Sequence, residues 1–291
     1  MITLKGWQQQ ILRKTNTYWL LRRIYRGIQL LFWQTRLIIK NKGRDAAIPA
    51  IRQGNIAMFH TLRSGSTVLS DLLKQHPKIF WDGEINAAYT VKWLNKQVAN
   101  GTHNLAEAIR RLQKRMFYVP ENGFYGFEIT SFDLWIGRIT LSDYVEHIHN
   151  LGIDYFIILK RKNFLKKKVS MLITKKTGQT HLLSSEEVRL TQIALDTKNL
   201  LKSLQQHHDY FSTLEELLKN SRVLLLTYED DISHDPLLGY RRVCNFLDIE
   251  YVEFPIQRKK TNPYGLSQVI LNFEEVKHTL SGTPFEWMLY D

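Results

Sequence analysis

Short apolar runs alternate with amphipathic stretches along most of the chain. Residues 154–160 (DYFIILK) and 222–227 (RVLLLT) are nearly continuous apolar runs, which are typical of buried parallel strands. Strands are predicted at 55–60, 79–81, 124–130, 154–160 and 222–227, helices at 68–75, 85–117, 141–151, 163–174, 186–220 and 235–247, and a polar loop at 175–185. This alternation predicts an α/β domain whose parallel sheet is flanked by helices.

The ends of three predicted strands point to a common site. The strands that end at His60, Lys160 and Thr227 each lead into a polar turn. Because ligands of such sheets bind at the carboxyl ends of the strands, we expect these three turns to meet.

The first of these turns, TLRSGST, has the composition of an anion site. Successive backbone N–H groups at a helix N-terminus bind anions, and Gly65 allows a close approach of the chain. Ser64, Ser66 and Thr67 add hydroxyl donors, and Arg63 adds a positive charge. The alternative is an ordinary strand-to-helix turn with a hydroxyl cap.

Two common nucleotide-binding motifs do not fit this turn. A Walker A loop needs a lysine after its last glycine, but here an arginine precedes the glycine instead. A dinucleotide fingerprint needs three spaced glycines, and only Gly65 is present. Both ATP-dependent kinases and NAD enzymes are therefore disfavoured.

The turn resembles that of a known enzyme family. Residues 63–67 (RSGST) are similar to the 5′-phosphosulfate loop, [KR]-S-G-[ST]-[ST], of sulfotransferases that use 3′-phosphoadenosine-5′-phosphosulfate (PAPS). With the His-Pro at 76–77, the chain resembles the bacterial carbohydrate sulfotransferases, among them the nodulation-factor and trehalose types. The resemblance covers residues 56–291. It implies a P-loop-like α/β fold and the transfer of a sulfuryl group from PAPS to an acceptor hydroxyl, as of a carbohydrate or glycolipid.

The resemblance also implies a second nucleotide contact. The family's 3′-phosphate motif is a basic residue followed, eight positions later, by a serine on the next helix. Lys162 and Ser170 have this spacing and Arg161 is one residue off, so either basic residue is a candidate. Basic side chains at a helix N-terminus oppose the helix dipole, which favours a bound anion there. The alternative is a solvated basic start of a helix.

Two further segments carry nucleotide-binding candidates through the resemblance. Tyr228 corresponds to a family tyrosine that contacts the adenine, and Glu229 would brace the site, although both also suit an acidic helix cap. Arg258, Lys259 and Lys260 lie in the segment that corresponds to the family's C-terminal 3′-phosphate contacts.

The acceptor hydroxyl needs a base, and Glu84 is the candidate because carbohydrate sulfotransferases often use a glutamate there. Asp82 is the second choice, and a capping role is the alternative for both. Arg63 would stabilise the leaving oxygen. His60, beside the turn, is expected to be structural. No metal is expected, since HExxH and CxxC motifs are missing and the single cysteine, Cys244, lies in an apolar pattern.

The N-terminal segment differs from the rest in charge. The chain has a formal net charge of +12, but residues 1–44 hold ten basic and no acidic residues, while the remainder holds 30 basic and 28 acidic ones. We divide the chain into an arm at 1–50 and a sulfotransferase domain at 51–291. Residues 18–40 predict a basic amphipathic helix, too often charged to cross a bilayer.

This helix either docks on its own domain or lies on an anionic membrane surface. The single cysteine and the lack of a signal-peptide pattern favour a cytoplasmic protein, peripheral on the membrane in the second case. Nucleic-acid binding is disfavoured because the charge is not spread over the domain. A non-catalytic nucleotide-binding module on a membrane is the alternative to an enzyme.

Overall fold

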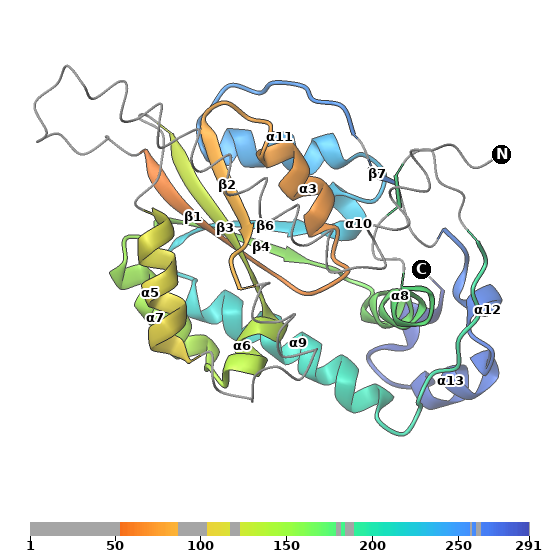
Figure 1. Cartoon of the computed structure of the whole chain (residues 1–291). Helices are drawn as coiled ribbons and strands as arrows, with labels where there is room; N and C mark the ends of the chain where they lie inside the picture. The colour runs from red at the N-terminus through yellow and green to blue at the C-terminus, as the bar shows by residue number, and fades with distance from the viewer. Residues whose placement is uncertain are drawn as a thin grey trace, which may run out of the picture.

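The computed structural model describes residues 53–86, 104–116, 123–178, 182–183, 189–256, 258–259 and 263–290. Its main sheet has five parallel strands in the order β2-β3-β1-β4-β6 (Figure 1). The strands are β1 (Gly54–His60), β2 (Ile79–Glu84), β3 (Phe124–Thr130), β4 (Tyr155–Lys160) and β6 (Arg222–Thr227). The prediction of an α/β fold with a parallel sheet is confirmed.

Strand β1 lies at the centre of the sheet, between β3 and β4. His60 is in register with Thr130 of β3 and Leu159 of β4, so these three strands end at the same level. Every residue of β1 is buried, because helices cover both faces of the sheet. Burial of each large apolar side chain contributes about 1.5–3 kcal/mol, which explains why this apolar run forms the centre.

One face of the sheet is covered by α3 (Ser66–Leu73), α10 (Tyr228–Asp231) and α11 (Pro236–Phe246), which lie above it in Figure 1. Met58 of β1 packs in one core cluster with Leu72 of α3 and Val243 of α11. Cys244 is fully buried in this cluster, as its apolar surroundings in the sequence indicate.

The opposite face packs against a second group of helices. Phe59 and Phe127 share a core cluster there with Leu214 and Val276. The elements on this side are α5 (Leu105–Met116), α6 (Ser131–Gly137), α7 (Leu141–Asn150), α8 (Phe164–Thr177), α9 (Leu200–Leu217), α12 (Leu266–Val269), α13 (Phe273–Leu280) and a 3₁₀ turn at Glu286–Leu289.

The segment from 175 to 220 departs from its prediction. Helix α8 continues to Thr177 and ends at Gly178, whose φ of +69° suits a helix terminus, with Lys175 in the last turn where a cation is favourable. A short strand, β5 (Leu182–Leu183), then pairs antiparallel with β7 (Arg258–Lys259). The prediction of a loop at 175–185 is therefore wrong at 175–177, which are helical, and at 182–183, which form a strand.

The predicted helix at 186–220 begins only at Leu200. Ile193 instead forms a parallel bridge with Ile270, and its backbone exchanges hydrogen bonds with Val269 and Leu271 at 2.8 Å. This pairing with a distant segment outweighs the local helical preference. Similarly, Ile85 lies in a turn, so the helix predicted from 85 does not begin there; residues 87–103 lie outside the described part.

The predicted amphipathic helix at 18–40 and the arm at 1–50 also lie outside the described residues. Among the helices that the structure describes, none combines the length and the apolar character required to cross a bilayer.

Candidate functional site

The turn after β1 has a backbone that only particular residues adopt easily. Arg63 and Gly65 both have positive φ, at +68° and +86°. A Cβ on Gly65 would lie 2.8 Å from Ile232 Cγ2 and 2.8 Å from Tyr228 Cδ2, so glycine is required both by φ and by space. Helix α3 starts immediately afterwards at Ser66. The Val68 amide donates to the Gly65 oxygen at 3.2 Å, so the amides of Ser66 and Thr67, which precede it, are the ones available to an anion.

Ser64 supplies a second feature of an anion site. Its side chain is fully buried, and its Oγ has no hydrogen-bond partner among the described residues. Leaving a buried hydroxyl unsatisfied costs about 1–3 kcal/mol, so this atom favours a bound molecule that hydrogen-bonds to it.

Two arginines and a serine join the turn to helix α8. The Nε–H of Arg63 donates to Ser170 Oγ at 3.0 Å, and Arg161 Nη1 donates to the backbone oxygen of Arg63 at 3.4 Å. Burial and, next, the charge of Arg161 lower the pKa of Arg63. An anion bound between the two guanidinium groups would relieve this repulsion.

Tyr228 and Glu229 connect the third turn to the same place. The Arg161 guanidinium lies 4.5 Å from the centroid of the Tyr228 ring, a cation–π contact. The Glu229 carboxylate accepts hydrogen bonds from the amides of Lys162 (2.8 Å) and Asn163 (3.2 Å). The turns after β1, β4 and β6 therefore meet, as predicted. Glu229 occupies the N-terminus of α8, so the helix dipole there already has its anion.

Lys162 is directed away from this meeting point. Its Nζ forms an ion pair with Asp230 at 2.5 Å, and its side chain is 46% exposed. The Arg161 side chain is only 13% exposed and contacts the turn, as described above. Of the two basic candidates left open by the sequence, the structure brings Arg161 and not Lys162 into contact with Arg63, which in turn donates to Ser170.

Glu84, at the end of β2, lies in a compact charged cluster with two neighbours. The carboxylates of Glu84 and Glu128 and the imidazole of His60 have ligand atoms within 4.8 Å of one another. His60 Nε2 is 3.2 Å from Glu128 Oε2, and Trp81 Nε1 donates to Glu128 Oε1 at 2.9 Å. Burial opposes ionisation of Glu128, but His60 lowers its pKa to about 2.

Asp82, the second candidate base, has structural partners instead. Its carboxylate accepts hydrogen bonds from Arg115 Nη1 at 2.6 Å and from the Tyr125 hydroxyl at 3.0 Å. The Asp82 side chain is buried, whereas Glu84 is half-buried at the strand end. The geometry therefore favours Glu84 over Asp82 for contact with a substrate.

The sequence analysis missed two buried polar groups near the site. Glu128 stands in an apolar strand, and its pairing with Glu84 depends on the register of β2 and β3. Lys167 looked like part of a solvated basic run, yet it is 5% exposed and contacts His207 of α9. Burial, then the charges of Lys168 and Arg161, lowers the pKa of Lys167 to about 7. Its position three residues before Ser170 was the available signal.

The C-terminal candidates are only partly described. The backbone of Arg258 and Lys259 forms β7, but their side chains, and all of Lys260, lie outside the described residues.

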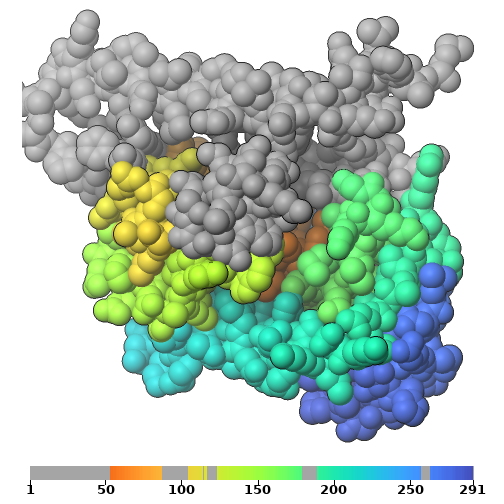
Figure 2. All heavy atoms as spheres, turned by 60° about the horizontal axis from the view of Figure 1, so that its bottom comes forward, coloured from red at the N-terminus to blue at the C-terminus, as the bar shows by residue number. Residues whose placement is uncertain are grey.

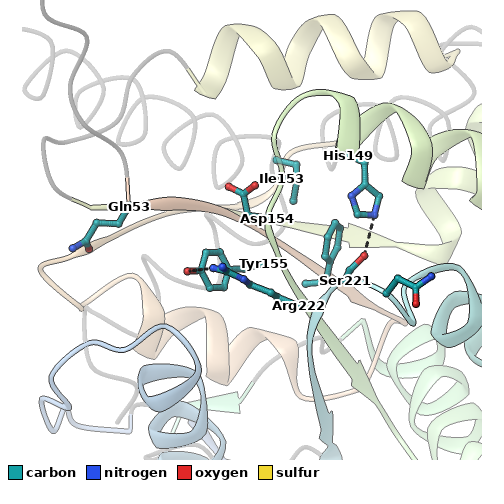
Figure 3. A pocket seen from close by; sticks show the side chains of 9 residues that line it. Gln53, His149, Ile153, Asp154, Tyr155, Ser221 and Arg222 are labelled. Atoms are coloured by element: carbon teal, nitrogen blue, oxygen red, sulfur yellow. Dashed lines mark hydrogen bonds between the residues drawn. The ribbon is translucent and has the colours of Figure 1, made fainter.

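A separate open hollow of about 420 Å³ lies at the other end of the sheet (Figure 3). Tyr155 and Arg222, at the amino ends of β4 and β6, line it, and Ser221 Oγ lies 3.3 Å from His149 Nε2. This hollow lies at the amino ends of the parallel strands, whereas the site around Arg63 lies at their carboxyl ends.

In Figure 2, orange atoms of the segment that contains β1, α3 and β2 are visible between the yellow-green atoms that follow β3 and the green atoms of α8. These are segments that supply candidate residues.

Comparison with models of known protein families and with curated protein sequences found no match for this chain.

Proposed function

We propose that this protein is a sulfotransferase that transfers a sulfuryl group from PAPS to an acceptor hydroxyl, of a carbohydrate or a glycolipid. The observation that carries the proposal is the hydrogen bond between Arg63 and Ser170. It joins the turn assigned to the 5′-phosphosulfate to the helix assigned to the 3′-phosphate. Both anionic groups belong to one nucleotide, so their two sites must lie side by side.

The 5′-phosphosulfate is assigned to the turn after β1, which would act as a P-loop-like cradle. The first amides of α3, the Ser64 hydroxyl and the hydroxyls of Ser66 and Thr67 are its donors. The buried Ser64 Oγ, which has no hydrogen-bond partner in the described part of the chain, supports this assignment, because a sulfate or phosphate oxygen would satisfy it.

The 3′-phosphate is assigned to Arg161 and Ser170. A guanidinium can bind a phosphate with two parallel hydrogen bonds, and the serine adds a hydroxyl donor. Tyr228 packs against the Arg161 guanidinium, which holds this side chain at the site. The contact of Tyr228 with adenine that the resemblance implies stays part of the proposal.

The reaction would be an in-line displacement at sulfur. The acceptor oxygen forms a bond to sulfur while the bond between sulfur and the bridging phosphate oxygen breaks, and adenosine 3′,5′-bisphosphate leaves. Arg63 and the turn amides stabilise the negative charge that develops on the bridging oxygen. Glu84 takes the proton of the acceptor hydroxyl as the new bond forms.

Calorimetric titration of the purified full chain tests nucleotide binding. Adenosine 3′,5′-bisphosphate should bind more tightly than adenosine 5′-monophosphate, which lacks the 3′-phosphate, and both more tightly than inorganic sulfate. Incubation with ³⁵S-labelled PAPS and glycan or glycolipid extracts then tests transfer. If the three compounds bind equally weakly and no label reaches any acceptor, the proposed function is wrong.

A further inference from the structure

The imidazole of His60 is completely buried and faces an oxygen atom on each side. Its Nδ1 is 3.2 Å from the backbone oxygen of Thr61, and its Nε2 is 3.2 Å from Glu128 Oε2. Both oxygens are acceptors, so a neutral ring would direct a lone pair at one of them. A ring with a proton on each nitrogen avoids this and forms a buried ion pair with Glu128.

The pair is the centre of a cluster to which four elements contribute. His60 comes from β1, Glu84 from β2, Glu128 from β3 and Ser70 from α3, and Lys74 is the C-cap residue of α3. The Ser70 hydroxyl and the positive charge of Lys74 both favour the ionised Glu128. Burial alone would lower the pKa of His60, but the hydrogen bond and charge of Glu128, then the charge of Glu84, raise it.

We propose that His60 is a positioning residue that keeps Glu84 ionised, and thereby able to accept the proton of the acceptor hydroxyl. The inference rests on the proposed function. The positive charge of His60 balances the negative charge of the Glu128 carboxylate, so Glu84 lies beside a pair with no net charge. Without His60, two carboxylates would share this small volume, and their mutual repulsion would favour protonation of one of them.

Stability alone does not explain the pair of His60 and Glu128. Other positions of β1, such as Met58 and Phe59, are apolar and fully buried. A buried ion pair is often no more stabilising than apolar residues of the same volume. The pair stands at the strand end beside Glu84, where a fixed positive charge has a chemical use.

The side chains of His60, Glu84 and Glu128 are also close enough together to act as ligands of one metal ion. A doubly protonated His60 has no lone pair for a metal, so metal binding by this cluster is incompatible with the charge state proposed for His60. Metal binding is therefore one of the outcomes that can overturn it.

The charge state of His60 is measurable without any activity assay. In ¹⁵N-histidine-labelled protein, one imidazole should keep both ring protons at pH 8, and its signals should vanish in His60→Gln. Finding only neutral rings at pH 8 would overturn the proposal. So would a stoichiometric divalent cation, detected by elemental mass spectrometry in the purified protein and lost in His60→Gln.

The pH dependence of kcat/KM tests the effect on Glu84. In His60→Gln, the acid limb should move up by about one pH unit or more, which is at least about a tenfold loss at a pH below both limbs. The nucleotide affinity should not change. The double variant His60→Gln/Glu128→Gln removes both charges and should return the acid limb close to that of the wild type.

A structural role would not produce this recovery. An unchanged acid limb in a folded His60→Gln protein contradicts the inference, even though turnover by the wild type supports the proposed function. If His60→Gln does not fold, the double variant still decides, because an acid limb far from that of the wild type contradicts cancellation of the two charges. Lack of turnover by the wild type would instead contradict the proposed function.

Discussion

Arg63 and Ser170 are 107 positions apart in the chain, yet the Nε–H of Arg63 donates to the Ser170 hydroxyl at 3.0 Å. This bond ties the turn after β1 to the helix after β4, whose strands are neighbours in the sheet. It also keeps the Arg63 side chain, which is attached to a backbone with positive φ, directed along the edge where a ligand would bind. The two residues thus form the link on which the proposed nucleotide site depends.

Replacing either residue should weaken nucleotide binding. A hydrogen bond to a charged group contributes about 1.5–3 kcal/mol, so Arg63→Ala should raise the Kd for adenosine 3′,5′-bisphosphate about 10- to 100-fold. Ser170→Ala should raise it less, because it removes a neutral hydroxyl. Calorimetric titration measures both effects. Arg222→Ala is the control, since Arg222 stacks on Tyr155 at the other end of the sheet; an equal loss there would contradict the assigned site.

Arg161 and Lys162 should differ in their preference for the 3′-phosphate. Arg161→Ala should reduce the affinity for adenosine 3′,5′-bisphosphate about tenfold or more, with a smaller effect on adenosine 5′-monophosphate. Lys162→Ala should change both affinities little, because Lys162 is paired with Asp230. The measurement is the Kd for adenosine 5′-monophosphate divided by the Kd for adenosine 3′,5′-bisphosphate in each variant, a ratio that should fall in Arg161→Ala. A ratio that falls only in Lys162→Ala would reverse the assignment.

Gly65→Ala should abolish nucleotide binding and destabilise the domain. The new Cβ would meet Tyr228 and Ile232 at 2.8 Å, in addition to the strain of φ +86°. Gly152→Ala is a matched control, because Gly152 has φ +76° but nothing within 4 Å of the Cβ position. It should cost only about 1 kcal/mol, measured by urea unfolding. A loss in Gly65→Ala no larger than that in Gly152→Ala would show that close approach is not required at the turn.

Lys167→Met should stabilise the protein below neutral pH. The folded-state pKa of Lys167, about 7, is below its ordinary value of 10.5. The unfolded chain therefore binds more protons between these two values, and wild-type stability from this group rises with pH across that window. The gain from Lys167→Met should be largest below pH 7, on the order of a few kcal/mol, and should shrink toward pH 10.5.

Urea unfolding at pH 6 and pH 9 measures this difference. Lys175→Met, on the exposed last turn of the same helix, is the control and should show no such dependence on pH. A Lys167→Met protein less stable than the wild type at pH 6 would show that the ammonium group of Lys167 is stabilised by its surroundings.

The amino-acid sequence was sufficient to predict the strands of the main sheet and the composition of the first turn. Apolar runs such as 154–160 predict buried strands because helices and neighbouring strands must cover both faces of a parallel sheet. The turn at 63–67 was recognisable because its glycine, hydroxyls and arginine act through backbone features that are local in the chain. Even the convergence of three turns follows from the rule that parallel strands end at one edge.

Which of several neighbouring side chains lie at the candidate site depends on contacts between distant parts of the folded chain. Arg161 and Lys162 are adjacent and equally basic, and their different partners, Tyr228 and Asp230, come from a distant turn. The pairing of His60 with Glu128 depends on two strands lying side by side in register. Lys167 is buried because α9 covers it. Charge and burial of such groups are set by long-range contacts, which residue spacing along the chain does not encode.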